Sequence, residues 1–188
     1  MPVRIGDNPH HFTDPSGFLS DCHRRIEIFI GSLKHVASVI DCPLTENARV
    51  ALESALRYFR EAAPKHTADE EQSLFPRLRR ISHPDVASAL KSLETLEGEH
   101  RWAEAAHAEV EALGNKCLAK GSLSPAESKA FREAVGGLAT MYAEHIRIED
   151  RLVFPVAARL LSDTDSAAIA SEMAARRSAT FVRKISHG

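Results

Sequence analysis

The chain has 188 residues and a formal net charge of −2, with acidic and basic residues mixed along its length. These values exclude a nucleic-acid binder, which would carry a basic face, and no apolar run reaches the length of a membrane span. Ala, Leu, Glu and Arg dominate over glycine and proline, which favours an all-α fold. Ten histidines are a high count for this length and are a first indication of a metal site.

The cysteines indicate the compartment. Cys22, Cys42 and Cys117 are far apart and include no Cys-x-x-Cys pair, so neither a zinc ribbon nor a redox pair is indicated. Free thiols are typical of a reducing compartment, and the first residues lack the apolar stretch of a signal peptide. We therefore expect a cytoplasmic protein.

The first half of the chain predicts an arm and two helices. Residues 1–14 contain His10 and His11 and predict an irregular N-terminal arm. Asp14-Pro15 is a helix start, and the helix should run to Ile40. Its apolar positions alternate in steps of four and three, as in a bundle: Leu19, His23, Ile26, Ile30, Leu33, Ala37 and Ile40.

A second helix is expected over residues 45–80. Pro64 should kink or restart it just before His66, because proline lacks the backbone N–H and clashes with the preceding turn. Its inward positions again follow the helical period: Ala48, Leu52, Ala55, Phe59, Ala62, His66 and Glu70.

The second half predicts two more long helices, over residues 85–116 and 125–161. Gly114 should weaken the end of the former, Ser124 and Glu127 form a capping box for the latter, and Pro155 should bend it. The inward positions are Ala89, Leu93, Leu96, His100, Ala103, His107 and Val110 in one helix, and Phe131, Val135, Leu138, Tyr142, His145, Glu149, Leu152 and Val156 in the other.

Short connections between four such helices predict an up-down-up-down antiparallel four-helix bundle over residues 15–161. Residues 162–188 predict a short fifth helix, from Asp163 to about Arg177, and a basic tail that contains His187. The expected organisation is thus an arm, one helical domain and a C-terminal extension.

One eleven-residue motif occurs twice, at residues 66–76 and 145–155. Both copies read His-x-x-x-Glu-acid-x-x-aliphatic-Phe-Pro. Residues i and i+4 share one face of a helix, so each histidine and its glutamate form half of a site for iron, manganese or zinc. A single copy is compatible with a surface ion pair, whereas two copies with the same Phe-Pro end favour a metal.

The spacing also predicts that the histidines meet. In an antiparallel bundle, residues equally far from a connecting loop lie at one height, and the four inward histidines match to within roughly 5 Å at 1.5 Å per residue. The two motif glutamates lie one turn away, close enough to bridge two ions. The predicted metal ligands are His23, His66, Glu70, His100, His145 and Glu149.

Other candidates are weaker. His107 lies roughly 10 Å along the axis from His100 and is predicted to be a hydrogen-bonded core histidine. Glu97 and Glu104 are nearer to the layer and are plausible extra carboxylates. His35 should face solvent and His83 should lie in a turn.

The doubled motif resembles that of the hemerythrin-like (HHE cation-binding) family, which carries it on the second and fourth helices and adds single histidines on the first and third. The resemblance covers roughly Pro15 to Leu161. It implies a non-haem diiron centre, that is, two iron ions with an oxo or hydroxo bridge; manganese or zinc are alternatives. The expected partner is a small molecule such as oxygen, peroxide or nitric oxide, and the oligomeric state stays open.

Oxygen-carrying members of that family have a His-x-x-x-His pair on the third helix. Here the residues four before and four after His100 are Leu96 and Glu104. This departure argues against reversible oxygen carriage and favours reaction with, or sensing of, the small molecule.

Several other functions are compatible with parts of the sequence. An iron–sulfur-cluster repair or nitric-oxide stress protein, and an oxygen sensor without catalysis, would use the same site. A ferritin-like protein needs two Glu-x-x-His motifs, and only Glu97–His100 has a plausible place in a helix. A metal-free interaction module would leave six polar groups buried at high cost.

Overall fold

A computed structural model describes residues 13–185, with side chains placed from residue 13 to residue 178. Histidines 10, 11 and 187 and most of the predicted arm and basic tail therefore lie outside the described residues. The elements are α1 (Pro15–Val39), α2 (Glu46–Glu61), α3 (Ala63–Asp69), the π-helical turn η1 (Glu70–Leu74), α4 (Phe75–Leu78), α5 (Val86–Lys120), α6 (Pro125–Ile148), the π-helical turn η2 (Glu149–Val153), α7 (Phe154–Leu160) and α8 (Asp163–Ile185).

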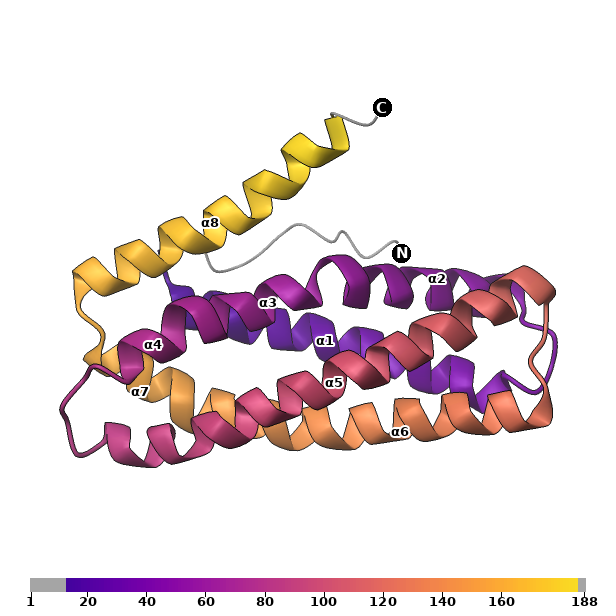
Figure 1. Ribbon diagram of the computed structural model, residues 1–188, viewed down its shortest axis with the longest axis horizontal. Helices are drawn as coiled ribbons and strands as arrows, with labels where there is room; N and C mark the ends of the chain where they lie inside the picture. Colours follow the sequence, from indigo (N-terminus) through magenta and orange to yellow (C-terminus); the bar gives the residue numbers. More distant parts are fainter. Residues whose placement is uncertain (1–12, 186–188) are drawn as a thin grey trace.

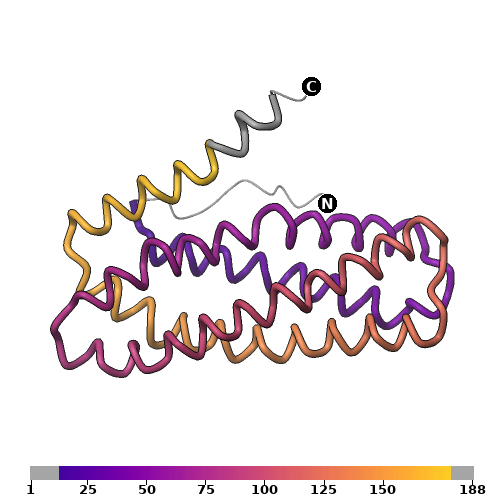
Figure 2. Tube along the Cα trace, viewed as in Figure 1, coloured from indigo at the N-terminus to yellow at the C-terminus, as the bar shows by residue number. Residues whose placement is uncertain are grey.

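The helices form the predicted all-α, antiparallel bundle (Figure 1). Four rods run side by side: α1, the segment α2–α3–η1–α4, α5, and the segment α6–η2–α7. The first rod packs against α2 and α6, and α5 packs against the same two helices. Figure 2 shows the chain turning back at alternate ends of the bundle. Each rod therefore lies next to the rods that precede and follow it in the sequence.

The helix ends follow the local sequence. The Asp14 side chain accepts a hydrogen bond from the N–H of Gly17, and Ser124 and Glu127 form the predicted capping box. Gly121, with a φ of 82°, ends α5 in the left-handed region that glycine adopts without strain.

The third rod is one turn longer than expected, because Gly114 serves a packing purpose. A Cβ added at Gly114 would lie 2.9 Å from Leu56 Cδ1 and 3.3 Å from Leu52 Cδ1. The missing side chain therefore allows α2 and α5 to approach closely. Contact between the rods offsets the low helix propensity of glycine, and α5 continues to Lys120.

The prolines shape two of the rods. The helix restarts at Ala63, just before Pro64, as predicted. Pro76 and Pro155 each follow a π-helical turn, in which the N–H of Phe75 bonds to Glu70 O and the N–H of Phe154 to Glu149 O. Proline cannot donate to the helical ladder and its ring crowds the carbonyl four residues earlier, so a widened turn before each proline relieves that conflict.

The core consists of two apolar clusters on either side of a polar layer. One cluster lies towards the α1–α2 and α5–α6 connections and contains Ile26, Ala63, Ala103 and Leu138. The other lies towards the α4–α5 connection and contains Leu19, Leu74, Leu96 and Val153. All six predicted ligands are buried between these clusters.

The C-terminal helix α8 crosses the outside of the bundle and contacts α1, α3 and η1 (Figure 1). Ile169 and Met173 are fully buried in the second apolar cluster. The buried carboxylate of Asp69 accepts bonds from Arg176 (2.7 Å) and Arg177 (2.6 Å). The helix continues to Ile185, beyond the expected end near Arg177. Among the described helices, none combines the length and apolarity needed to cross a bilayer.

Candidate metal centre

The structure brings together all six residues that the sequence singled out. His23 comes from α1, His66 from α3 and His100 from α5, whereas His145 lies near the end of α6. Glu70 and Glu149 are the first residues of the two π-helical turns. Four rods thus contribute to one layer, in which the side chains form two groups that could each hold a metal ion.

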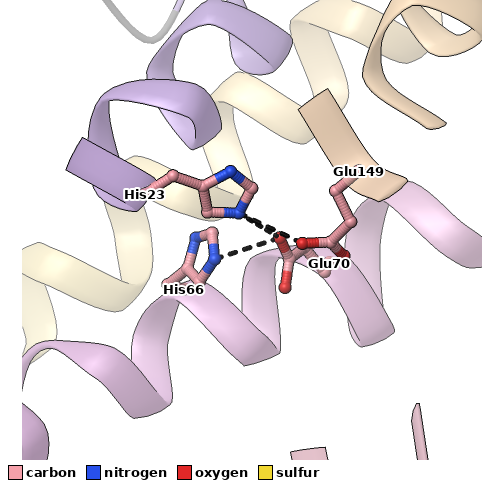
Figure 3. A group of neighbouring side chains, drawn as sticks. All are labelled: His23, His66, Glu70 and Glu149. Atoms are coloured by element: carbon pink, nitrogen blue, oxygen red, sulfur yellow. Dashed lines mark ion pairs between the residues drawn. The ribbon is translucent and has the colours of Figure 1, made fainter. Parts of the chain in front are cut away.

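The first group contains His23, His66, Glu70 and Glu149 (Figure 3). His23 Nε2 lies 3.1 Å from Glu149 Oε2 and 3.8 Å from Glu70 Oε1. His66 Nε2 lies 3.1 Å from Glu70 Oε1. All four side chains point toward a common centre, and their ligand atoms lie within 4.8 Å of one another.

The second group contains His100, His145 and the same two glutamates. His145 Nε2 lies 3.1 Å from Glu149 Oε2, and His100 Nε2 lies 3.5 Å from Glu70 Oε2. The Nε2 atoms of the two histidines are only 3.0 Å apart. Both glutamates therefore lie between two pairs of histidines, as carboxylates that bridge two ions would.

The burial of these polar atoms fits a metal centre. Glu70 and Glu149 are fully buried, yet none of their four carboxylate oxygens has a hydrogen-bond partner among the described residues. His23 Nε2 is in the same position. Buried polar atoms are nearly always hydrogen-bonded, and leaving a buried carboxylate unpaired costs several kcal/mol. Cations between these atoms would satisfy them.

Carboxylates around the layer orient three of the four histidines. His23 Nδ1 lies 2.8 Å from Asp150, His100 Nδ1 2.8 Å from Glu71, and His145 Nδ1 2.8 Å from Glu99. Such contacts fix the tautomer that leaves Nε2 free for a metal and raise the basicity of the ligand.

The fourth histidine lacks this support, because His66 Nδ1 is buried without a partner among the described residues. Sequence reasoning did not identify the roles of Glu71, Glu99 and Asp150. For two of them a signal existed, since an acid directly follows the glutamate in both motif copies. Glu99 had no comparable signal.

The supporting acids connect the two halves of the chain. Asp150, in the second motif copy, holds His23 of the first helical hairpin. Glu71, in the first copy, holds His100 of the second hairpin. Each motif therefore supplies a histidine and a glutamate to the layer and orients a histidine from the other hairpin.

Burial and mutual repulsion perturb the charges of the layer. Burial, and then the neighbouring Glu149, raise the pKa of Glu70 well above its ordinary value. Burial also acts to raise the pKa of Glu149, but the imidazoles of His145 and His23 outweigh it and hold that pKa below its ordinary value. Burial lowers the pKa of His66, which keeps its imidazole neutral and able to bind a metal.

The weaker candidates lie outside both groups. His107 Nε2 is 3.0 Å from the hydroxyl of Tyr142 and its ring stacks on Phe59, as expected of a hydrogen-bonded core histidine. Glu97 pairs with Arg79 at 2.8 Å, and Glu104 is exposed. His35 is exposed as predicted, and His83 is exposed in the connection that precedes α5. The cysteines are free thiols, with Cys22 and Cys117 buried and Cys42 exposed.

A pocket of about 390 Å³ opens beside the second group, between α2, α3 and α5. His100 and Glu71 form part of its wall. A much smaller cavity, of about 10 Å³, lies among the four histidines. The two spaces share four lining residues, namely Ala63, Thr67, His100 and Tyr142.

Comparison with known proteins agrees with this geometry. A search of curated proteins finds no match. The family model described as the hemerythrin HHE cation-binding domain matches residues 14–157, which include the first three rods, most of the fourth and every member of the two groups. The chain therefore belongs to the hemerythrin HHE cation-binding domain family.

Proposed function

We propose that this cation-binding domain holds two iron ions and reacts with a small molecule such as oxygen, peroxide or nitric oxide. The observation that carries the proposal is the pair of four-residue groups that share Glu70 and Glu149. Each group offers two imidazoles and two carboxylates, and the buried carboxylate oxygens have no other partners among the described residues.

The chemistry of the donors favours iron. Imidazole and carboxylate ligands without a thiolate suit iron and manganese, whereas structural zinc sites are commonly closed by cysteine. The free thiol of Cys22 belongs to neither group. Bound iron would supply the capacity to exchange electrons with oxygen, peroxide or nitric oxide.

The protein's own residues support reaction or sensing rather than reversible storage. No histidine stands four residues from His100 on α5, and Glu104, at i+4, is exposed and belongs to neither group. Two histidines and two shared carboxylates leave positions open around each ion. The supporting acids hold the imidazoles in place, and the apolar clusters on either side exclude bulk water from the layer.

Metal analysis tests the proposal directly. After anaerobic loading with ferrous iron and removal of the excess, we expect about two iron ions per chain. The same samples should be offered zinc in competition. A stoichiometry near one, or preferential retention of zinc, would contradict the diiron assignment.

A further inference from the structure

We propose that the pocket beside His100 binds an uncharged, mainly apolar organic molecule with one hydroxyl group, of the alkylphenol class. The pocket, at about 390 Å³, is far larger than a diatomic molecule needs and falls within the range of about 300–1,000 Å³ typical of sites for organic ligands. That the molecule is a substrate of the metal centre rests on the proposed function, whereas its binding does not.

The inner wall of the pocket is apolar. Its buried residues include Leu56, Phe59, Ala63, Ala103 and Val110. A planar or aliphatic body would remove this surface from water, and each square ångström of apolar surface buried contributes about 25 cal/mol. The wall therefore selects an apolar body and not a sugar or a nucleotide.

His107 and Tyr142 form the hydrogen-bonding pair that we expect to receive the hydroxyl group of the ligand. His107 lines the pocket and bonds to the Tyr142 hydroxyl through Nε2 at 3.0 Å. Its Nδ1 has no partner among the described residues. Burial lowers the pKa of His107 to about 4, so its imidazole is neutral near pH 7. A neutral imidazole offers a hydrogen bond to a hydroxyl group without attracting an anion.

The charged residues at the rim do not favour a charged ligand. Arg60 pairs with Glu111 at 2.8 Å, and Glu71 is held by His100. Arg101 and Glu104 add one charge of each sign. Since two arginines face three glutamates, the rim gives an organic carboxylate no net attraction, and the apolar wall gives an amine no partner at depth.

The pocket and the small cavity among the histidines share a wall. A molecule bound in the pocket would therefore lie beside the metal layer. Tyr142 lies between them, because it bonds to His107 on the pocket side and its ring centroid is 6.4 Å from that of His145. An organic molecule here would thus lie next to the half of the centre formed by His100 and His145.

Binding of three matched probes tests the proposal. Titrations of the purified protein by calorimetry should use 4-propylphenol, propylbenzene and 4-propylbenzoate, with the metal content measured in each sample. We expect saturable binding of one 4-propylphenol per chain, about five- to tenfold tighter than propylbenzene, as one hydrogen bond provides. The benzoate should bind more weakly than either.

Two pairs of variants test whether the probe binds in this pocket. Ala108→Trp fills the pocket from an exposed position, and Ala105→Trp puts the same side chain on an exposed position of α5 that does not line the pocket. The first should reduce binding at least tenfold and the second should leave it unchanged. His107→Phe keeps the ring but not the imidazole hydrogen bond, and should reduce the preference for 4-propylphenol over propylbenzene. Arg101→Gln should leave both affinities unchanged.

Three results would overturn the proposal. Absence of saturable binding, or equal binding by the two tryptophan variants, would show that the pocket is not the site. Tighter binding of the benzoate, lost in Arg101→Gln, would assign the pocket to an anion. Probe binding without iron would leave the inference standing while the diiron assignment fails, and iron without probe binding would do the reverse.

Discussion

The two halves of the metal layer contain the same ligand types but differ in their surroundings. On one side, His23 stacks against Phe154 at 5.1 Å, and His66 Nδ1 has no partner within the described part of the chain. On the other side, His100 and His145 both have carboxylate partners, and His100 borders the large pocket. One half is enclosed and incompletely supported, whereas the other is fully supported and open to ligands.

The residues that precede the histidines of α1 and α5 also differ between the halves. Glu99, the residue before His100, supports His145. The residue before His23 is Cys22, whose buried thiol lies 2.9 Å from the guanidinium of Arg25. Burial raises the pKa of that thiol, so it stays neutral and cannot replace a carboxylate. A thiol thus stands before the histidine of α1, where an acid stands before the histidine of α5.

Removing a ligand that both groups share should lower the iron content of both halves. Glu149→Ala removes one ligand from both groups, so we expect it to lose nearly all of about two iron ions. His66→Ala and His145→Ala each remove a ligand from one group only and should retain about half of the iron. All three should melt at a lower temperature, because the remaining carboxylates lose the cations that satisfy them.

His107→Ala is the control for these variants, since His107 belongs to neither group. Its iron content, measured by elemental analysis after the same loading, should equal that of the wild type. Equal iron loss from His66→Ala, His145→Ala and His107→Ala would contradict the assignment of ligands.

Exposure to air should show that the open half reacts with oxygen rather than storing it. The centre lacks the additional histidine of oxygen carriers, and carboxylates favour ferric over ferrous iron. We therefore expect rapid and irreversible oxidation of the reduced protein. Stopped-flow absorbance can monitor this reaction. A spectral change that reverses under argon and returns with air would instead identify a carrier or sensor.

Glu99→Gln should make the two halves more alike. It removes the carboxylate that supports His145 Nδ1, and His66 Nδ1 has no such support among the described residues. Loss of a residue that orients a metal-bound histidine typically costs about 10–100-fold in metal affinity. We expect a loss of this size for one of the two ions only, measured by competition with a chelator. Glu97→Gln, which affects a carboxylate paired with Arg79, should leave both affinities unchanged.

A further prediction concerns His107 and the pH dependence of stability. Its pKa is about 4 in the folded protein and about 6.5 in an unfolded chain. Between these values the unfolded chain binds the proton more readily, so stability falls as the pH is lowered from 6.5 to 4 and then levels off. The stability of the wild type relative to His107→Gln should decrease by about 3 kcal/mol between pH 7 and pH 4, as urea unfolding can measure. An unchanged difference would contradict the buried, neutral state.

The sequence predicted the bundle and the meeting of the six side chains because both depend on periodicity and chain length. Steps of three and four placed His23 and His66 on inward faces, and loop-to-histidine counts placed them at one height. Similar counting failed for Glu99, whose contact depends on the rotation of α5 against α6. It also failed at Gly114, where contact with Leu56 outweighs helix propensity.

The π-helical turns and the length of α8 were likewise not predicted. Pro155 indicated a bend in the fourth helix, but not the π-helical turn that precedes the proline of each motif. The docking of α8 through Arg176 and Arg177 onto Asp69 is a contact between residues more than a hundred positions apart, which periodicity does not reveal.

The exchange of supporting acids between the hairpins has a consequence for the order of events during folding. A hairpin that has formed alone holds two histidines and one glutamate. However, the acid that orients His23 lies on the second hairpin, and the acid that orients His100 lies on the first. Iron that arrives before the hairpins dock should therefore dissociate quickly, and only docking should trap it. The rate of metal uptake would then report on the assembly of the two hairpins and not on the formation of their helices.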